Sequence, residues 1–208
     1  MATAERYVGG GVLRKEDATL LTGQGTFVES ITLPGTLHVA FVRSPYGAAA
    51  IGSIDTTAAR AAPGVVGVLT GEDLAEEWAA ALPMAWPVTD DIRIPDHWPV
   101  AKDAVRYVGD AVAVVVAESR AQAADAADLV DVDYEERPAV VDIESARADD
   151  APRVHESFED NDCYTWVHTN GDVDAAFAKA DVRVKERYTQ PRLIPNAIEP
   201  RAVVVQPT

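Results

Sequence analysis

Cysteine is almost absent from this sequence of 208 residues, which contains one, Cys163. One thiol cannot form a disulfide within the chain. It also cannot supply by itself the ligands of a cysteine-type zinc site or an iron–sulfur cluster. We therefore predict no metal ligands in this chain and a cytoplasmic location.

Positive charge is also scarce. The chain has 18 lysines and arginines against 34 aspartates and glutamates, a formal net charge of −16. Such a surface repels phosphate backbones and anionic lipid headgroups. No stretch approaches the ~20 apolar residues that cross a bilayer, and residues 1–11 lack the basic start and apolar run of an export signal. We predict neither nucleic acid nor a membrane as a partner.

The composition is that of a folded protein, with 48% hydrophobic and 25% charged residues,. Apolar, β-rich runs predict a central strand over residues 37–42, a strand over 65–69, and a central strand over 111–117 with both faces covered,. Residues 130–135 alternate apolar and acidic side chains, as a half-exposed strand does,. Phe27 and Val28 are expected to be the first buried strand residues. Strands mixed with helices indicate the α+β class.

Several short helices are predicted from their caps. Asp55 is placed to cap a helix that reaches Arg60,. Two pairs have the spacing of a capping box, Thr70 with Asp73 and Ser119 with Gln122,. The first box predicts a helix across Leu74 and Trp78, and the second predicts a helix with an apolar face formed by Ala123, Ala126, Ala127 and Val130,.

The connections carry their own predictions. Gly109-Asp110 lies between two β-rich runs, 105–108 and 111–117, and predicts a hairpin,. Residues 83–99 are irregular and far longer than an ordinary connection of ~4–6 residues,. This segment either packs against another part of a larger protein or follows the surface.

The second part of the chain begins after a linker at residues 148–152,. Gly171-Asp172 predicts the start of a short helix. Beyond it, an edge strand is predicted because Val182, Val184 and Tyr188 alternate with basic residues,.

Candidate chemistry is sparse. The four histidines, His38, His97, His155 and His168, are scattered and lie near no recognised nucleophile, so we predict no catalytic residue,. The most unusual segment is 190–201, in which prolines fix the backbone around Arg192, Glu199 and Arg201,. It is compatible with a ligand site or with a salt-bridged connection. Residues 9–11 are glycines, which suit an extended arm better than a phosphate loop, since no strand precedes them.

Short motifs in a fixed order resemble the start of a molybdenum hydroxylase large subunit, the family of xanthine dehydrogenase, aldehyde oxidase and the aerobic carbon monoxide dehydrogenase large chain. The motifs are Tyr7-Val8-Gly9, Arg14-Lys15-Glu16-Asp17, Leu21-Thr22-Gly23-Gln24-Gly25, Arg43-Ser44-Pro45, Ile54-Asp55, Pro63-Gly64-Val65, Leu69-Thr70-Gly71-Glu72-Asp73-Leu74, Val105-Arg106-Tyr107-Val108-Gly109, Val114 to Ser119, Val132-Asp133-Tyr134, Gly171-Asp172-Val173, Ala176-Phe177 and Glu199-Pro200-Arg201.

The resemblance implies three parts: an N-terminal arm (1–21), an α/β-hammerhead domain (22–147), and a linker with the start of the first molybdopterin-binding domain (148–208). It further implies that the full-length parent hydroxylates a carbon centre with water at a molybdenum–molybdopterin cofactor. The partners would be flavin-binding and iron–sulfur subunits or domains and the remainder of the large subunit.

Two departures from the family pattern shape the expectation. Tyr46 follows Arg43-Ser44-Pro45 where relatives commonly carry histidine, and the family's Gly-Gly-Phe-Gly segment is absent from these residues. We therefore expect no bound cofactor and no activity in this fragment, with Glu199 and Arg201 as the candidates nearest the cofactor. A stand-alone hammerhead interaction module without catalysis is the alternative.

Overall fold

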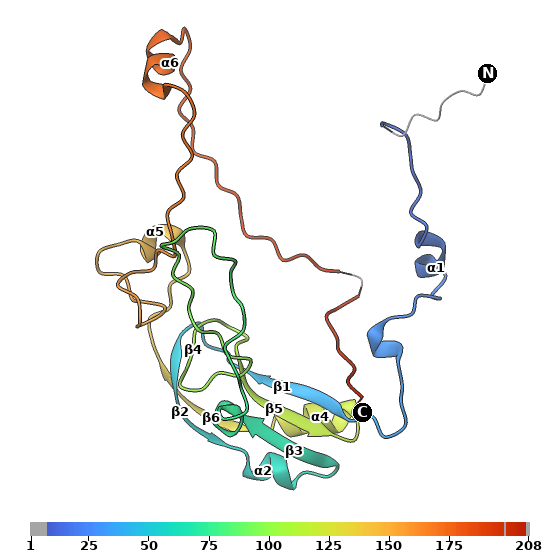
Figure 1. Cartoon of the computed structure of the whole chain (residues 1–208). Coiled ribbons are helices and arrows are strands. Elements are labelled where there is room, and N and C mark those ends of the chain that lie inside the picture. Colours follow the sequence, from blue (N-terminus) through green and yellow to red (C-terminus); the bar gives the residue numbers. More distant parts are fainter. Residues whose placement is uncertain (1–7, 198, 207–208) are drawn as a thin grey trace, which may run out of the picture. The chain divides into compact units, whose positions relative to one another are not determined.

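The computed structural model describes residues 8–197 and 199–206, and it divides into two units. One unit comprises Gly35–Arg183, and the other comprises Met1–Pro34 with Val184–Thr208. Figure 1 shows the elements of both in chain order. Tyr7 and Ile198, which belong to segments singled out in the sequence, lie outside the described residues.

The larger unit is built around a three-stranded antiparallel sheet with the order β1-β5-β3. Its strands are β1 (His38–Arg43), β5 (Ala111–Ala117) and β3 (Val65–Thr70). Strand β5 is apolar throughout and lies in the middle, which confirms the prediction of a central strand. The pattern succeeded because an unbroken apolar run is typical of a strand whose two faces are both covered.

Two helices contact this sheet, α2 (Thr57–Ala61) and α4 (Arg120–Ala127). Ala59 and Ala126 are fully buried and pack with Val68 of β3 and Val115 of β5. Alanine side chains let the helix axes come close to the strands, which confirms the predicted alanine face of α4. Its start is also confirmed in part, because the Ser119 hydroxyl accepts a hydrogen bond from the Gln122 N–H at 3.3 Å.

A second sheet has the order β4-β2-β6, formed by β4 (Ala104–Val105), β2 (Ala49–Asp55) and β6 (Asp131–Glu136). It encloses a second core in which Ala49, Val105 and Val112 are buried. In β6 the apolar residues face this core and the carboxylates face solvent, so the half-exposed strand is confirmed. Burial raises the pKa of the Tyr134 hydroxyl. The Tyr134 ring packs on the ring of Tyr46, with centroids 5.2 Å apart.

The predicted hairpin is wrong. Residues 105–108 and 111–117 do not pair, because β4 joins β2 in one sheet while β5 joins β1 and β3 in the other. The chain does turn at Gly109, where φ is +92°. The turn is held by Ser44, whose N–H donates to the Asp110 carbonyl at 2.8 Å and whose carbonyl accepts from the Gly109 N–H at 2.8 Å. The segment therefore crosses between two sheets.

Strand β1 is an edge strand, not the central strand that its apolar composition predicted. Val39 is 54% exposed and Phe41 is 47% exposed. Composition reports which side chains avoid water, but it cannot show whether a second neighbour pairs with the backbone. The Arg43 guanidinium stacks over the Phe41 ring at 5.2 Å and shields part of it,.

Helix α3 (Gly71–Leu74) confirms the first capping box. The Thr70 hydroxyl accepts from the Asp73 N–H at 3.3 Å, and the Asp73 carboxylate accepts from the Thr70 N–H at 2.8 Å. This backbone hydrogen bond is the main cause that lowers the pKa of Asp73. The helix ends at Leu74 and does not continue to Trp78 as predicted. The Trp78 ring stacks on Trp98 with centroids 5.4 Å apart.

Two further helices complete the larger unit, α5 (Ile143–Ala146) and α6 (Val173–Lys179). The start of α6 is confirmed, because the Asp172 carboxylate accepts from the Ala175 N–H at 2.9 Å. The predicted edge strand at residues 182–188 is wrong, since no described strand pairs with that backbone.

The smaller unit contains the helix α1 (Asp17–Leu21) and the 3-10 helix η1 (Val28–Ser30). The arm is therefore not extended throughout. Phe27 and Val28 are half-buried and begin a 3-10 turn, so the strand predicted there is wrong. The turn closes through the Ser30 N–H, which donates to the Phe27 carbonyl at 2.9 Å.

Candidate functional site

The two residues nominated from the sequence, Glu199 and Arg201, lie in the smaller unit on a tail without helix or strand. The Glu199 carboxylate accepts a hydrogen bond at 3.2 Å from the N–H of Val28, the first residue of η1. Arg192 and Arg201 are exposed. None of the pockets described among residues 8–197 and 199–206 is lined by these residues, and we assign them no chemical step.

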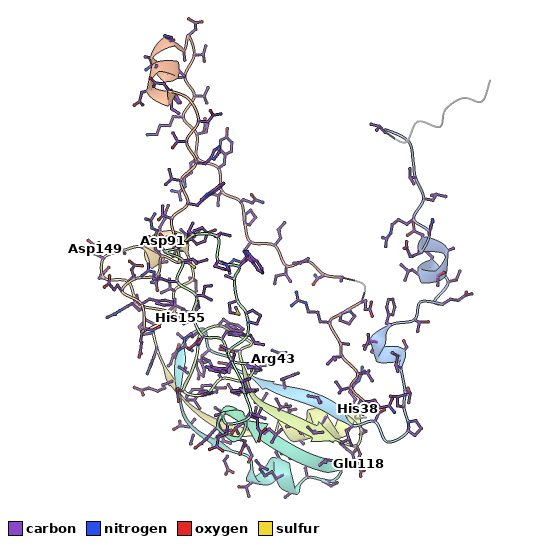
Figure 2. All side chains as sticks on the ribbon, viewed as in Figure 1. His38, Arg43, Asp91, Glu118, Asp149 and His155 are labelled. Atoms are coloured by element: carbon purple, nitrogen blue, oxygen red, sulfur yellow. The ribbon has the colours of Figure 1, made fainter. Side chains whose placement is uncertain are left out.

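Two of the four histidines, by contrast, come together in the larger unit. His97 and His155 line one pocket of about 480 Å³ with Tyr107, between the irregular connection and the segment after the linker. The rings of His97 and Tyr107 are 6.1 Å apart. Figure 2 shows where His155 and His38 lie on the chain. The sequence carried no signal for this pairing, because neither spacing nor motif connects the two histidines.

The electrostatics of this pocket follow from burial and from its charged neighbours. Burial lowers the pKa of His155, and the positive charges of Arg106 and His97 lower it further. Burial also raises the pKa of Tyr107, with added contributions from the charge of Asp110 and a hydrogen bond to it. A neutral imidazole and a neutral phenol can donate or accept hydrogen bonds, and Lys102 and Ser157 line the same pocket.

A pH dependence follows from His155. Because its pKa is lower in the folded state, the unfolded chain binds the proton more readily below the ordinary histidine pKa of about 6.5. The stabilising contribution is complete above that pH and is lost as the pH falls toward the lowered pKa. We expect the melting temperature of the wild type to fall more between pH 7.5 and pH 5.5 than the melting temperature of His155→Gln does. The control is His168→Gln, at an exposed position, which should show the same change in melting temperature between the two pH values as the wild type.

Three arginines that precede the linker hold the segment that follows it. Arg106 donates from Nε to the Val154 carbonyl at 3.2 Å, and Arg137 pairs with Glu156 at 2.9 Å. Arg93, from the irregular connection, binds the Asp160 carboxylate and the Asp162 carbonyl. Residues 83–99 thus contact the segment 160–163 of the same chain through Arg93, and packing against another part of a larger protein stays a prediction.

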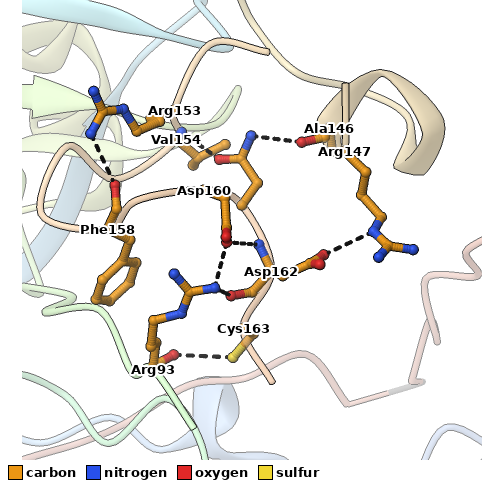
Figure 3. Close-up of polar contacts among 10 residues, drawn as sticks. Arg93, Ala146, Arg147, Arg153, Val154, Phe158, Asp160, Asp162 and Cys163 are labelled. Atoms are coloured by element: carbon orange, nitrogen blue, oxygen red, sulfur yellow. Dashed lines mark hydrogen bonds and ion pairs between the residues drawn. The ribbon is translucent and has the colours of Figure 1, made fainter. Parts of the chain in front are cut away.

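Figure 3 shows the Arg93 contacts in detail. The backbone N–H of Arg93 donates to the Cys163 carbonyl at 2.9 Å, and the Cys163 thiol donates to the Arg93 carbonyl at 3.0 Å. The guanidinium also stacks over the Phe158 ring at 5.7 Å. Nearby, the Asn161 side chain donates to the carbonyls of Ala146 and Pro152 at 3.0 Å each. Asn161 thus forms hydrogen bonds with residues at both ends of the linker.

Replacing Arg93 tests this attachment. The Arg93 side chain is 30% exposed, so losing its charge-assisted hydrogen bonds should cost about 1–2 kcal/mol of local stability,. For Arg93→Ala we expect hydrogen–deuterium exchange in residues 158–163 to be about 5- to 30-fold faster. Arg93→Lys should recover little, because an ammonium group cannot bridge two acceptors as a guanidinium does. Unchanged exchange in both variants would contradict the attachment.

Metal and membrane features were also sought among the described residues. They include no group of three or more histidine, cysteine, aspartate or glutamate side chains placed to hold a metal ion. None of their helices has the length and apolar character needed to span a membrane.

The two linked sheets and their alanine-faced helices define an α+β domain of the hammerhead class. The chain belongs to the aldehyde oxidase and xanthine dehydrogenase a/b hammerhead domain family, whose model matches residues 22–138. A second family model, the molybdopterin cofactor-binding domain, matches residues 154–208. The fold class and the resemblance predicted from sequence are thereby confirmed.

Curated relatives match nearly the whole chain. The 6-hydroxypseudooxynicotine dehydrogenase complex subunit gamma of Paenarthrobacter nicotinovorans is 35% identical over 98% of this chain and 26% of its own length. The carbon monoxide dehydrogenase large chain of Afipia carboxidovorans is 37% identical over 94% of this chain and 25% of its own length. The chain therefore spans about a quarter of the length of these relatives.

Solved structures agree with these matches. Quinoline 2-oxidoreductase from Pseudomonas putida 86 superposes with a TM-score of 0.70 and 39% identity, covering 82% of this chain and 21% of that one. The aldehyde oxidoreductase from Desulfovibrio gigas superposes with a TM-score of 0.64 and 29% identity, covering 81% of this chain and 19% of that one.

Proposed function

We propose that this chain is the N-terminal portion of the molybdopterin-binding large subunit of a xanthine dehydrogenase/aldehyde oxidase-type oxidoreductase, which hydroxylates a carbon centre with water as the oxygen source. One observation carries the proposal: two family matches follow each other in order, a hammerhead domain at residues 22–138 and a molybdopterin cofactor-binding domain at 154–208. The cofactor supplies the redox chemistry when bound, and the protein holds and orients it.

The proposed division of labour within the chain follows the sequence boundaries. Residues 1–21 are the arm, residues 22–147 are the hammerhead domain, and residues 148–208 are the linker and the start of the molybdopterin-binding domain. The contacts of Arg93, Arg106 and Arg137 support a structural role for the hammerhead domain, because they fix the segment 153–163 at the entry to the cofactor domain. Glu199 and Arg201 lie further along that domain and remain candidates near the cofactor.

The proposed partners are a flavin-binding and an iron–sulfur subunit or domain, and the remainder of the large subunit. The support is that relatives are described as a dehydrogenase complex subunit gamma and as large chains or large subunits, names that imply further subunits in those proteins. We place the protein in the cytoplasm, in line with its single cysteine,.

The test is a comparison of this chain with the complete reading frame that contains it, produced together with the subunits encoded beside it. Bound molybdenum is measured by mass spectrometry, and activity by dye reduction with purine, aldehyde, N-heterocycle and carbon monoxide substrates. We expect metal and activity in the long form, and neither in the 208-residue chain. Absence of metal from both would overturn the proposal and favour a stand-alone interaction module.

A further inference from the structure

A second pocket of about 410 Å³ lies between β2, β4 and the segment after the linker, next to the histidine pocket described above, with which it shares Arg106 and Val154 in its wall. Three arginines line it, Arg106, Arg137 and Arg153, together with the carboxylates of Asp103 and Glu156. The rest of its wall is largely apolar and includes Ala48, Ala49, Val105, Pro138, Val140 and Pro152.

The charge of this pocket is opposite to that of the chain. Three guanidinium groups face two carboxylates, in a protein whose formal net charge is −16. In the other pockets described, carboxylates equal or outnumber the lysines and arginines. A local excess of positive charge in an acidic protein concentrates small anions at that position.

The three guanidinium groups are only partly used by the protein. Arg106 donates through Nε to the Val154 carbonyl at 3.2 Å, and Arg153 donates through Nη1 to the Phe158 carbonyl at 3.2 Å. Arg137 donates through Nη1 to Glu156 at 2.9 Å. Among the described residues, each guanidinium is thus engaged through one nitrogen, and its remaining N–H groups are the kind that bind oxyanions in pairs.

Glu156 occupies the position that an exogenous anion would take. Its side chain is 81% exposed, and the Arg137 side chain that it meets is 46% exposed. Exposed ion pairs of this kind contribute little to stability, so a ligand with a better-placed oxyanion can displace the glutamate. The segment 152–156 therefore forms one wall of the pocket, and its Glu156 carboxylate competes with an external anion for Arg137.

We propose that this pocket is a binding site for a small organic oxyanion, a carboxylate or phosphate group carried on an apolar body. Arg137 and Arg153 bind the oxyanion, Arg106 adds positive charge, and the alanine and proline wall contacts the apolar body. The site is independent of the molybdenum cofactor, so it stands or falls separately from the function proposed above.

The experiment is a calorimetric titration of the 208-residue chain with two probes, sodium benzoate and inorganic phosphate, at low ionic strength. We expect Arg137→Ala and Arg153→Ala each to weaken binding about tenfold or more, because each removes charge-assisted hydrogen bonds. Glu156→Gln should strengthen binding several-fold, since it removes the competing carboxylate. Tighter binding of benzoate than of phosphate would identify the carboxylate class, and the reverse order would identify the phosphate class.

The arginine variants are expected to lose affinity and Glu156→Gln to gain it, and this contrast distinguishes an effect on binding from an effect on folding. A variant that merely unfolds loses affinity and melting temperature together, whereas Glu156→Gln gains affinity. Arg14→Ala, which removes the same charge from an exposed ion pair with Asp17 in the smaller unit, is the matched control and should bind as the wild type does. Failure of both probes to bind, or equal affinity in wild type, Arg137→Ala and Glu156→Gln, would overturn the proposal.

Discussion

Replacing Gly71 with alanine is expected to destabilise the hammerhead domain by about 2–3 kcal/mol, which lowers the melting temperature by about 5–10 °C. Gly71 is the first residue of α3 and is buried. A Cβ atom there would lie 2.3 Å from the carbonyl oxygen of Ala101 and 2.8 Å from its carbonyl carbon. Both atoms belong to the backbone, so relief of the clash requires α3 and the segment before β4 to move apart.

A matched glycine provides the control. Gly67 lies in β3, four residues earlier, and a Cβ atom at that position would meet nothing within 4 Å. We expect Gly67→Ala to change the melting temperature by less than about 2 °C. Thermal unfolding followed by circular dichroism measures both variants, and equal effects at the two positions would show that Gly71 is not in close contact with Ala101.

Replacing Val115 with alanine is expected to cost about 2–3 kcal/mol, because two buried methyl groups are lost and a cavity is left behind. Val115 is fully buried in the central strand β5, where it packs with Val68, Ala59 and Ala126. The other buried residues of this core are one valine and two alanines, whose short side chains cannot extend far into the gap,.

The control for Val115 is the same substitution on the surface. Val66 in β3 is 60% exposed, so Val66→Ala should change the free energy of unfolding by less than about 0.5 kcal/mol,. Chemical denaturation with a common slope gives both values. A loss below 1 kcal/mol for Val115→Ala would place β5 outside the core and contradict the sheet order.

Local interactions were predictable from sequence. The Thr70–Asp73 box, the Asp172 cap and the Ser119 cap each lie within three residues of the groups they satisfy, so their geometry needs no information about the rest of the chain. The same holds for the alternation of β6, because period-2 patterning directly reports which side chains face the core,.

Contacts between distant residues were not predictable in the same way. Nothing in the sequence connects His97 with His155, or Arg137 with Glu156, because their proximity depends on how the irregular connection and the linker pack on the sheets. The pocket lined by three arginines was missed for this reason, since the sequence shows only isolated arginines among many carboxylates.

The sequence by itself determined the class of protein, the starts of the helices α3, α4 and α6, and the buried run of β5, because these depend on local spacing and on an ordered set of motifs. Only the tertiary structure decided that β1 is an edge strand, that residues 104–105 and 111–117 belong to different sheets, and which charged groups meet. Apolar patterning specifies which side chains are removed from water. Which strands and which charged groups pair with each other depends on the complete tertiary structure.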